Sequence, residues 1–199
     1  MLVKIPLGLD KKYSEKLISR GLRLNCVHNI YSDLWSDTWG EFVNIDNWSK
    51  NDERLSSFNN LTNKWNKNSP LVNWYERRLS LIEIDVITSM GLGLSLSDLI
   101  LIYNLQFPVL QQNENDTWYD QKGNIVFTCS KGLNGVGLDR SVWNTIRNMR
   151  EGETYEHTIE KSELYHGERV TYYAPFEKCD RVEDYKVAWA HFEKIFNQN

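Results

Sequence analysis

Stretches in which apolar residues recur every three or four positions predict helices in the first half of the chain. The strongest such pattern covers 71–90, and Gly91 follows it as a stop signal. A weaker pattern predicts a helix over 11–20 that Gly21 ends, and a further one predicts a helix over 26–39. One face of this third helix carries Val27, Ile30, Tyr31, Leu34 and Trp35.

The stretch 99–105 differs from these because it is apolar on nearly every side, so we expect a helix that is buried all round. Ser95 or Ser97 can cap its start, and Pro108 breaks or kinks it. Near the end of the chain, spacings of three and four return. They favour a last helix that docks on the core through Val182, Tyr185, Trp189, Phe192 and Phe196.

Strand signals belong to the second half of the chain. Segments 118–119 and 125–128 have strand composition, and the Asp-Gln-Lys-Gly sequence between them favours a tight turn, which together predict a hairpin. Alternating residues over 154–160 and 170–174 predict a second hairpin. We therefore expect an α+β fold with a helical first half, a small antiparallel sheet of hairpins in the second half, and a closing C-terminal helix.

The length of 199 residues suits one domain, or two small lobes around a shared core, and we predict a single α+β domain over 1–199. Segment 44–70 stands apart because it is polar and rich in Asn, Lys and Ser. We predict that it is a flexible or insert-like segment. The first residues open no obvious complete domain, so we expect the chain to be the C-terminal part of a larger protein.

Charge and cysteine content limit the function classes. The formal net charge is −4, which counts against a strong independent DNA binder, because such domains are usually basic. The three cysteines are far apart and form no CxxC pair. This spacing fits a reducing cytoplasm and argues against disulfides or structural zinc. No apolar run is long enough to span a membrane.

Two local features could carry chemistry. A glycine-rich loop over 130–137 contains Lys131 and is followed by Arg140, and the two cations could meet nucleic-acid phosphates. The structural alternative is a loop whose glycines supply positive φ angles. Asp120 and Lys122 resemble half of a nuclease metal site, but they occupy a turn, where both residue types are common. The histidines show no metal-ligand spacing, and no catalytic residue is predicted.

Three separated blocks carry a resemblance to a known family. They are 94–138, which contains YNLQFPV followed by TWYDQKGNIVFT, then 168–189 (ERVTYYAPFEKCDRVEDYKVAW), and more weakly 23–35 (RLNCVHNIYSDLW). Together they resemble the C-terminal region of large bacterial class I adenine-specific DNA methyltransferases. Those enzymes use S-adenosylmethionine and belong to restriction-modification or phage-defence systems.

The methyltransferase motifs themselves do not occur in this sequence. It has no Asn-Pro-Pro-Tyr motif to hold a flipped adenine and no glycine-rich cofactor turn within a βαβ unit. The resemblance therefore implies a segment that binds no cofactor of its own, since S-adenosylmethionine would bind a methyltransferase domain that is absent here. It implies an accessory role: positioning or recognising DNA, or holding the catalytic domain or a partner subunit.

Two functions follow from these observations. If the module contacts DNA, we expect Lys131 and Arg140 to bind phosphates, with Trp118 or Tyr119 packing nearby. The alternative is a protein-interaction or scaffold module without DNA contact, which the acidic charge and the abundant aromatic residues suit. An exposed apolar patch would favour this alternative, and the candidate residues for it are Trp35, Trp39 and Trp189.

Overall fold

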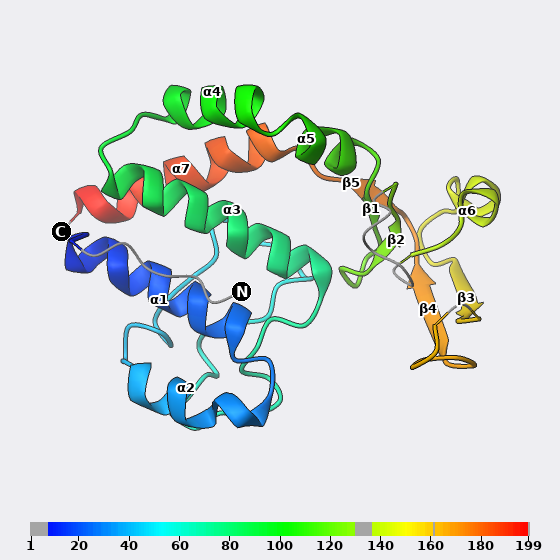
Figure 1. The fold of residues 1–199 in the computed structure, drawn as a ribbon, viewed down its shortest axis with the longest axis horizontal. Coiled ribbons are helices and arrows are strands. Elements are labelled where there is room, and N and C mark those ends of the chain that lie inside the picture. The colour runs from blue at the N-terminus through cyan, green and yellow to red at the C-terminus, as the bar shows by residue number, and fades with distance from the viewer. Residues whose placement is uncertain (1–7, 130–136, 161, 199) are drawn as a thin grey trace. The chain divides into compact units, whose positions relative to one another are not determined.

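The computed structural model describes residues 8–129, 137–160 and 162–198. Helices dominate the first half, the strands lie in the second half, and a helix closes the chain, so the predicted α+β fold is confirmed (Figure 1). The chain divides into two compact units. Unit 1 comprises Met1–Val72, Glu76–Tyr103 and Arg181–Asn199, and unit 2 comprises Asn73–Tyr75 and Asn104–Asp180.

Unit 1 is helical, and α3 and α4 continue from it into unit 2 at one end each. Its elements are α1 (Lys11–Asn25), the 3₁₀ helix η1 (Asn29–Tyr31), α2 (Ser32–Thr38), α3 (Trp74–Gly91), α4 (Leu96–Gln106) and α7 (Arg181–Asn197). The predicted core face of α7 is confirmed, because Tyr185, Phe192 and Phe196 are buried.

Two helix predictions near the N-terminus need correction. Gly21 does not end α1, which continues to Asn25. A glycine inside a helix costs about 1 kcal/mol, and burial of Leu22 and Leu24 in the added turn outweighs that cost. The single helix expected over 26–39 is instead the short η1 followed by α2.

Segment 44–70 forms no helix or strand, yet it supplies part of the core of unit 1. Phe58 and Leu61 are buried in one cluster with residues of α1 and α2. Two tryptophan side chains of the segment donate hydrogen bonds to backbone carbonyls: Trp48 Nε1 to Ser56 at 2.9 Å, and Trp65 Nε1 to Cys26 at 2.7 Å. Segment 44–70 is therefore polar in composition, as an insert would be, yet it carries buried side chains that hold it to the core of unit 1.

Unit 2 contains two antiparallel sheets, α5 and α6. The strands are β1 (Trp118–Tyr119), β2 (Ile125–Phe127), β3 (Thr154–Thr158), β4 (Arg169–Tyr173) and β5 (Glu177–Lys178), and the helices are α5 (Pro108–Asn115) and α6 (Arg140–Ile146). Both predicted hairpins are confirmed, as β1 pairs with β2 and β3 pairs with β4. Strand β5 adds a third member to the first sheet by pairing with β1.

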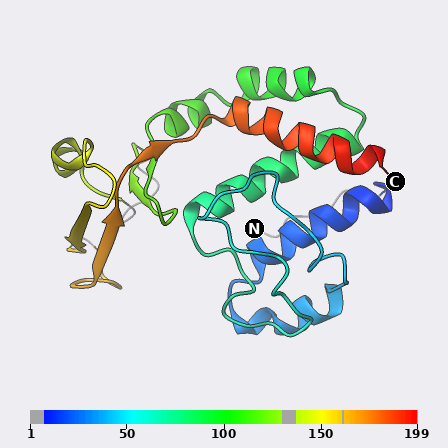
Figure 2. The ribbon, with the colours of Figure 1, turned by 180° about the vertical axis from the view of Figure 1, so that it is seen from behind.

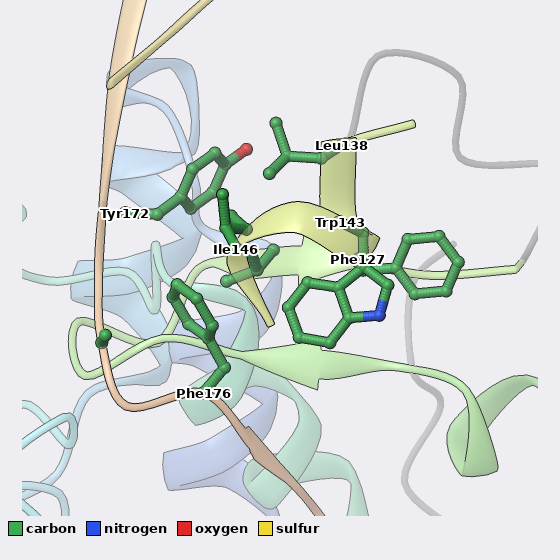
Figure 3. Close-up of a cluster of buried hydrophobic side chains, with 8 residues drawn as sticks. Phe127, Leu138, Trp143, Ile146, Tyr172 and Phe176 are labelled. Carbon is green, nitrogen blue, oxygen red and sulfur yellow. The ribbon is translucent and has the colours of Figure 1, made fainter. Parts of the chain in front are cut away.

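Trp143 of α6 lies at the centre of the hydrophobic core of unit 2 (Figure 3). Its ring stacks on Phe127 with centroids 5.7 Å apart and meets Phe176 at 5.6 Å. The other buried members are Val126, Leu138, Ile146, Tyr172 and Ala174. Within the described ranges, no helix combines the length and the apolar character needed to cross a membrane.

Candidate functional site

Both aromatic residues predicted for DNA contact take part in the packing of unit 2. The Trp118 ring lies 5.1 Å from that of Trp143, between centroids, and Lys178 Nζ lies 5.2 Å from the Trp118 centroid. Tyr119 is only 6% exposed, and its ring meets Tyr75 edge-on at 5.9 Å. Tyr119 is therefore not available to stack on a base, and Trp118 is only half-buried.

Of the two predicted phosphate-binding cations, Lys131 lies outside the described residues, so only Arg140 has a defined place. Its side chain is 60% exposed, and Nη2 lies 2.8 Å from Asp116 Oδ2. The guanidinium also lies 4.8 Å from the Phe127 ring centroid. An exposed ion pair of this kind contributes at most about 1 kcal/mol. Arg140 therefore has an intramolecular partner in Asp116, but their ion pair is weak.

The charge of unit 2 opposes a DNA role for this region. By sequence, unit 2 holds eight Lys and Arg against twelve Asp and Glu, a formal net charge of −4. Unit 1 holds fifteen of each sign, so the whole net charge of the chain belongs to unit 2. Phosphates approaching Arg140 would meet a surplus of carboxylates.

The nuclease alternative rests on Asp120, whose carboxylate is fully buried. Its Oδ1 accepts the backbone N–H groups of Lys122 at 2.9 Å and Asn124 at 2.8 Å. Its Oδ2 accepts the Asn124 amide at 3.1 Å and the Tyr173 N–H at 3.3 Å. Asp120 therefore organises the turn, which Gly123 completes with a φ of +82°. Among the described His, Cys, Asp and Glu residues, no group of three could hold a metal ion.

Unit 1 contains buried charges that the sequence patterns did not predict. Arg20 and Glu83 are both fully buried, with Arg20 Nε 2.6 Å from Glu83 Oε2, and Arg20 Nη1 lies 2.8 Å from Asp46 Oδ2. Glu83 belongs to α3, and charged residues are rarely buried unless they are paired. Burial alone would lower the pKa of Arg20, but Asp46 and Glu83 together raise it above its usual value.

A second buried arginine fixes the same segment to α1. Arg23 Nε and Nη1 donate to the backbone carbonyls of Ser69 at 3.2 Å and Ser56 at 3.1 Å. Glu76 of α3 accepts the Ser56 hydroxyl at 2.7 Å. Burial lowers the pKa of Arg23 to about 10, with Glu76 acting in the opposite direction. These contacts are structural, because each one joins segment 44–70 to a helix.

A polar cavity of about 320 Å³ opens in unit 1, lined by 46–51 with Ser57 and Phe58. Its two charged lining residues already have partners. Asp46 binds Arg20 and Lys16, and Lys50 binds Asp184. Since neither charge is left for a ligand, this cavity gives no basis for a binding site.

The most unusual surface belongs to α4, which lies in unit 1 up to Tyr103 and in unit 2 from Asn104. Its inner side packs as predicted: Leu99 and Tyr103 are each 7% exposed, and the Tyr103 ring meets Tyr185 of α7 edge-on at 5.9 Å. The outer side is also apolar, and it is open. Its exposed fractions are 55% for Leu101, 41% for Ile102 and 67% for Leu105. The expectation that this helix is buried all round is therefore wrong.

These three residues form what we call the α4 surface: Leu101, Ile102 and Leu105. They share one side because Leu105 lies four positions after Leu101 and three after Ile102, and side chains at these spacings lie close on a helix. Ser95 fixes the start of α4, as predicted: its N–H and hydroxyl donate to Asp98 Oδ2 at 2.9 and 2.6 Å. The same hydrogen bonds lower the pKa of Asp98. Figures 1 and 2 show α4 beside α7, at the edge of unit 1 opposite α2.

The α4 surface is also free of charge. No Asp, Glu, Lys or Arg occurs between Leu99 and Asn113. Two of the tryptophans named as candidates for an exposed patch pack together instead: Trp35 is fully buried, and the Trp39 ring lies on it with centroids 5.6 Å apart. The third, Trp189, is half-buried on α7. The exposed patch exists, but aliphatic residues form it.

Comparison of the chain with protein-family models, with curated proteins and with solved structures found no match. The function is therefore argued from the geometry of the molecule.

Proposed function

We propose that this chain is a protein-interaction module and that it docks through the α4 surface. The observation that carries the proposal is the exposure of Leu101, Ile102 and Leu105 on a helix that is apolar on nearly every side. A helix with apolar residues all round is normally covered all round. In this chain one side packs on α7 and the other faces solvent, so a second molecule is the natural cover.

Apolar area removed from water stabilises an interface by about 25 cal/mol per Å². Isolated exposed leucines are common on protein surfaces, but contiguous apolar patches mark interaction sites. The three members of the α4 surface are neighbours on one helix side, so they form a patch and not scattered exposure.

The lack of charge indicates a second copy of the chain as the partner. In a two-fold symmetric contact the same patch meets itself, so any charged group near the axis would meet its own like charge. The absence of Asp, Glu, Lys and Arg from Leu99 to Asn113 avoids this repulsion. An antiparallel contact between two α4 helices would cover Leu101, Ile102 and Leu105 from both molecules.

The DNA-positioning role, and the methyltransferase domain or subunit that the resemblance implies as partner, stay predictions. They receive less support from the geometry. Tyr119 is buried, Arg140 binds Asp116, and unit 2 carries the negative charge of the chain.

Sedimentation velocity from micromolar to millimolar concentration tests the proposal. We expect a reversible monomer–dimer equilibrium in the wild type. Ile102→Asp with Leu105→Asp should be monomeric throughout, with an unchanged melting temperature because both side chains are exposed. Leu164→Asp is the matched control, since Leu164 is 85% exposed in unit 2, and it should dimerise like the wild type. A wild type that is monomeric at every concentration, or a double variant that dimerises normally, would contradict the proposal.

A further inference from the structure

A second group of exposed apolar residues in unit 1 lies on η1 and α2 and at Val27, two positions before η1. We call it the α2 surface: Val27, Ile30, Tyr31 and Leu34, with exposed fractions of 52%, 78%, 39% and 42%. The sequence placed these residues on one helix face together with Trp35. In the structure only Trp35 turns inward, where it is fully buried and donates from Nε1 to the Thr62 carbonyl at 2.9 Å.

The inner side of α2 is therefore already occupied. Trp35 packs in one cluster with Cys26, Val43 and Phe58, all of which are buried. Trp35 and this cluster fix the orientation of α2. The apolar residues of the α2 surface cannot reach the same core without displacing Trp35.

Uncompensated acidic groups accompany the α2 surface. Asp33, Asp37 and Glu41 are all exposed, and none of them forms an ion pair in the part of the chain that the structure describes. The sequence holds no Lys or Arg from Leu24 to Ser49. The α2 surface thus differs from the α4 surface, which is uncharged.

Asp33 lies in the first turn of α2, where the helix dipole favours a carboxylate, but its spacing from Asp37 and the position of Asp37 are unfavourable. Asp33 and Asp37 are four residues apart on α2, and like charges at this spacing destabilise a helix by about 0.2–0.5 kcal/mol. Asp37 also lies in the last turn, where the helix dipole disfavours a negative charge. Leu34 lies three positions before Asp37, a spacing that brings the two side chains close together on the helix. A cation placed over this edge would relieve both unfavourable terms.

We propose that the α2 surface docks a basic amphipathic helix of a partner protein. The apolar face of that helix would cover Ile30 and Leu34, and its lysine or arginine residues would pair with Asp33 and Asp37. The charge argues against other occupants. A second copy would bring the same carboxylates together, and nucleic acid or an anionic membrane would be repelled.

This inference does not depend on self-association through α4. In both views the helices α2 and α4 lie apart, with α1, α3 and α7 between them (Figures 1 and 2). A partner helix on α2 leaves the α4 surface open. The Ile102→Asp with Leu105→Asp variant therefore separates the two proposals, because it should lose dimerisation and keep helix binding.

The test uses two designed amphipathic peptides with the same leucine pattern, one with lysine and the other with glutamate at the polar positions. Fluorescence anisotropy of the labelled peptides measures binding to the full chain. We expect the lysine peptide to bind, to bind more weakly as salt rises, and to bind far better than the glutamate peptide. Equal binding of both peptides, or no binding of the lysine peptide, would overturn the proposal.

Three variants test whether the lysine peptide binds at the α2 surface. Asp33→Asn with Asp37→Asn should weaken binding by up to about fivefold for each carboxylate. Ile30→Ser with Leu34→Ser should weaken it by at least about tenfold. Leu164→Ser, which removes an apolar side chain that is 85% exposed in unit 2, should change nothing. Affinity that is unchanged in the carboxylate variant would overturn the proposal even if the apolar variant failed to fold.

Discussion

The buried Arg20–Glu83 pair allows a sharp test of how unit 1 is held together. In Glu83→Gln, the side chain keeps its shape and loses its charge. Arg20 then keeps Asp46 as a partner at 2.8 Å but loses the carboxylate at 2.6 Å. The Ser49 N–H, which donates to Glu83 Oε1 at 2.6 Å, is left with a weaker acceptor.

The expected cost follows from burial. Both Arg20 and Glu83 are fully buried, so water cannot replace the lost carboxylate. Removing one partner of a buried ion pair destabilises a protein by about 3–5 kcal/mol. Because Asp46 still compensates part of the arginine charge, we expect the lower end, about 3 kcal/mol. For a chain of this length that loss lowers the melting temperature by about 6–12 °C.

Urea unfolding followed by tryptophan fluorescence measures this loss, because four of the eight tryptophans, Trp35, Trp39, Trp48 and Trp65, pack in or against the core of unit 1. Glu193→Gln is the matched control, since it removes the same charge from an exposed position of α7. It should unfold like the wild type. If Glu83→Gln also stays within about 1 kcal/mol of the wild type, the pair is not buried as described and the reasoning fails.

Three further outcomes are expected. Burial acts to raise the pKa of Asp46, but Arg20 holds that pKa below its usual 3.8. The contribution of the Asp46 carboxylate to folding stability is therefore complete above pH 3.8 and is lost on further acidification. Urea midpoints should fall less steeply below about pH 4 in Asp46→Asn than in the wild type. Burial lowers the pKa of His191 below 6.5, so the stability tied to its neutral form is lost as pH falls from there; thermal melts of His191→Gln should lose less stability between about pH 7 and pH 5, and an equal loss would contradict this. Duplex binding measured across a salt series should be weak and unchanged by Lys131→Ala with Arg140→Ala, whereas strong binding that this double variant abolishes would restore the DNA role.

The sequence predicted the hairpins well because their signals are local. Asp120 accepts N–H groups from residues two and four positions later, and Gly123 adopts the positive φ that the turn requires. The helix register of α7 was predictable for the same reason, since its period of three to four residues is fixed by the helix itself.

The buried charges could not be predicted in this way. Arg20 and Glu83 are 63 positions apart, and each looks like an ordinary polar residue on its own helix. Their burial depends on where α1, α3 and segment 44–70 meet, which no local pattern contains. The polar composition of that segment suggested an insert, whereas its Phe58 is a buried anchor.

The predictions for α2 and α4 identified apolar faces but did not foresee that the fold leaves these faces open. Periodicity identifies which residues share a helix face, but it does not say whether this chain or another molecule covers that face. Ile30 and Leu105 both lie on apolar faces that the fold leaves open, at 78% and 67% exposure. Chance exposure would not explain why one open face lacks charge altogether and the other carries carboxylates of one sign. The two proposals therefore assign different partners to the two faces, and a chain that held both partners at once would bridge them.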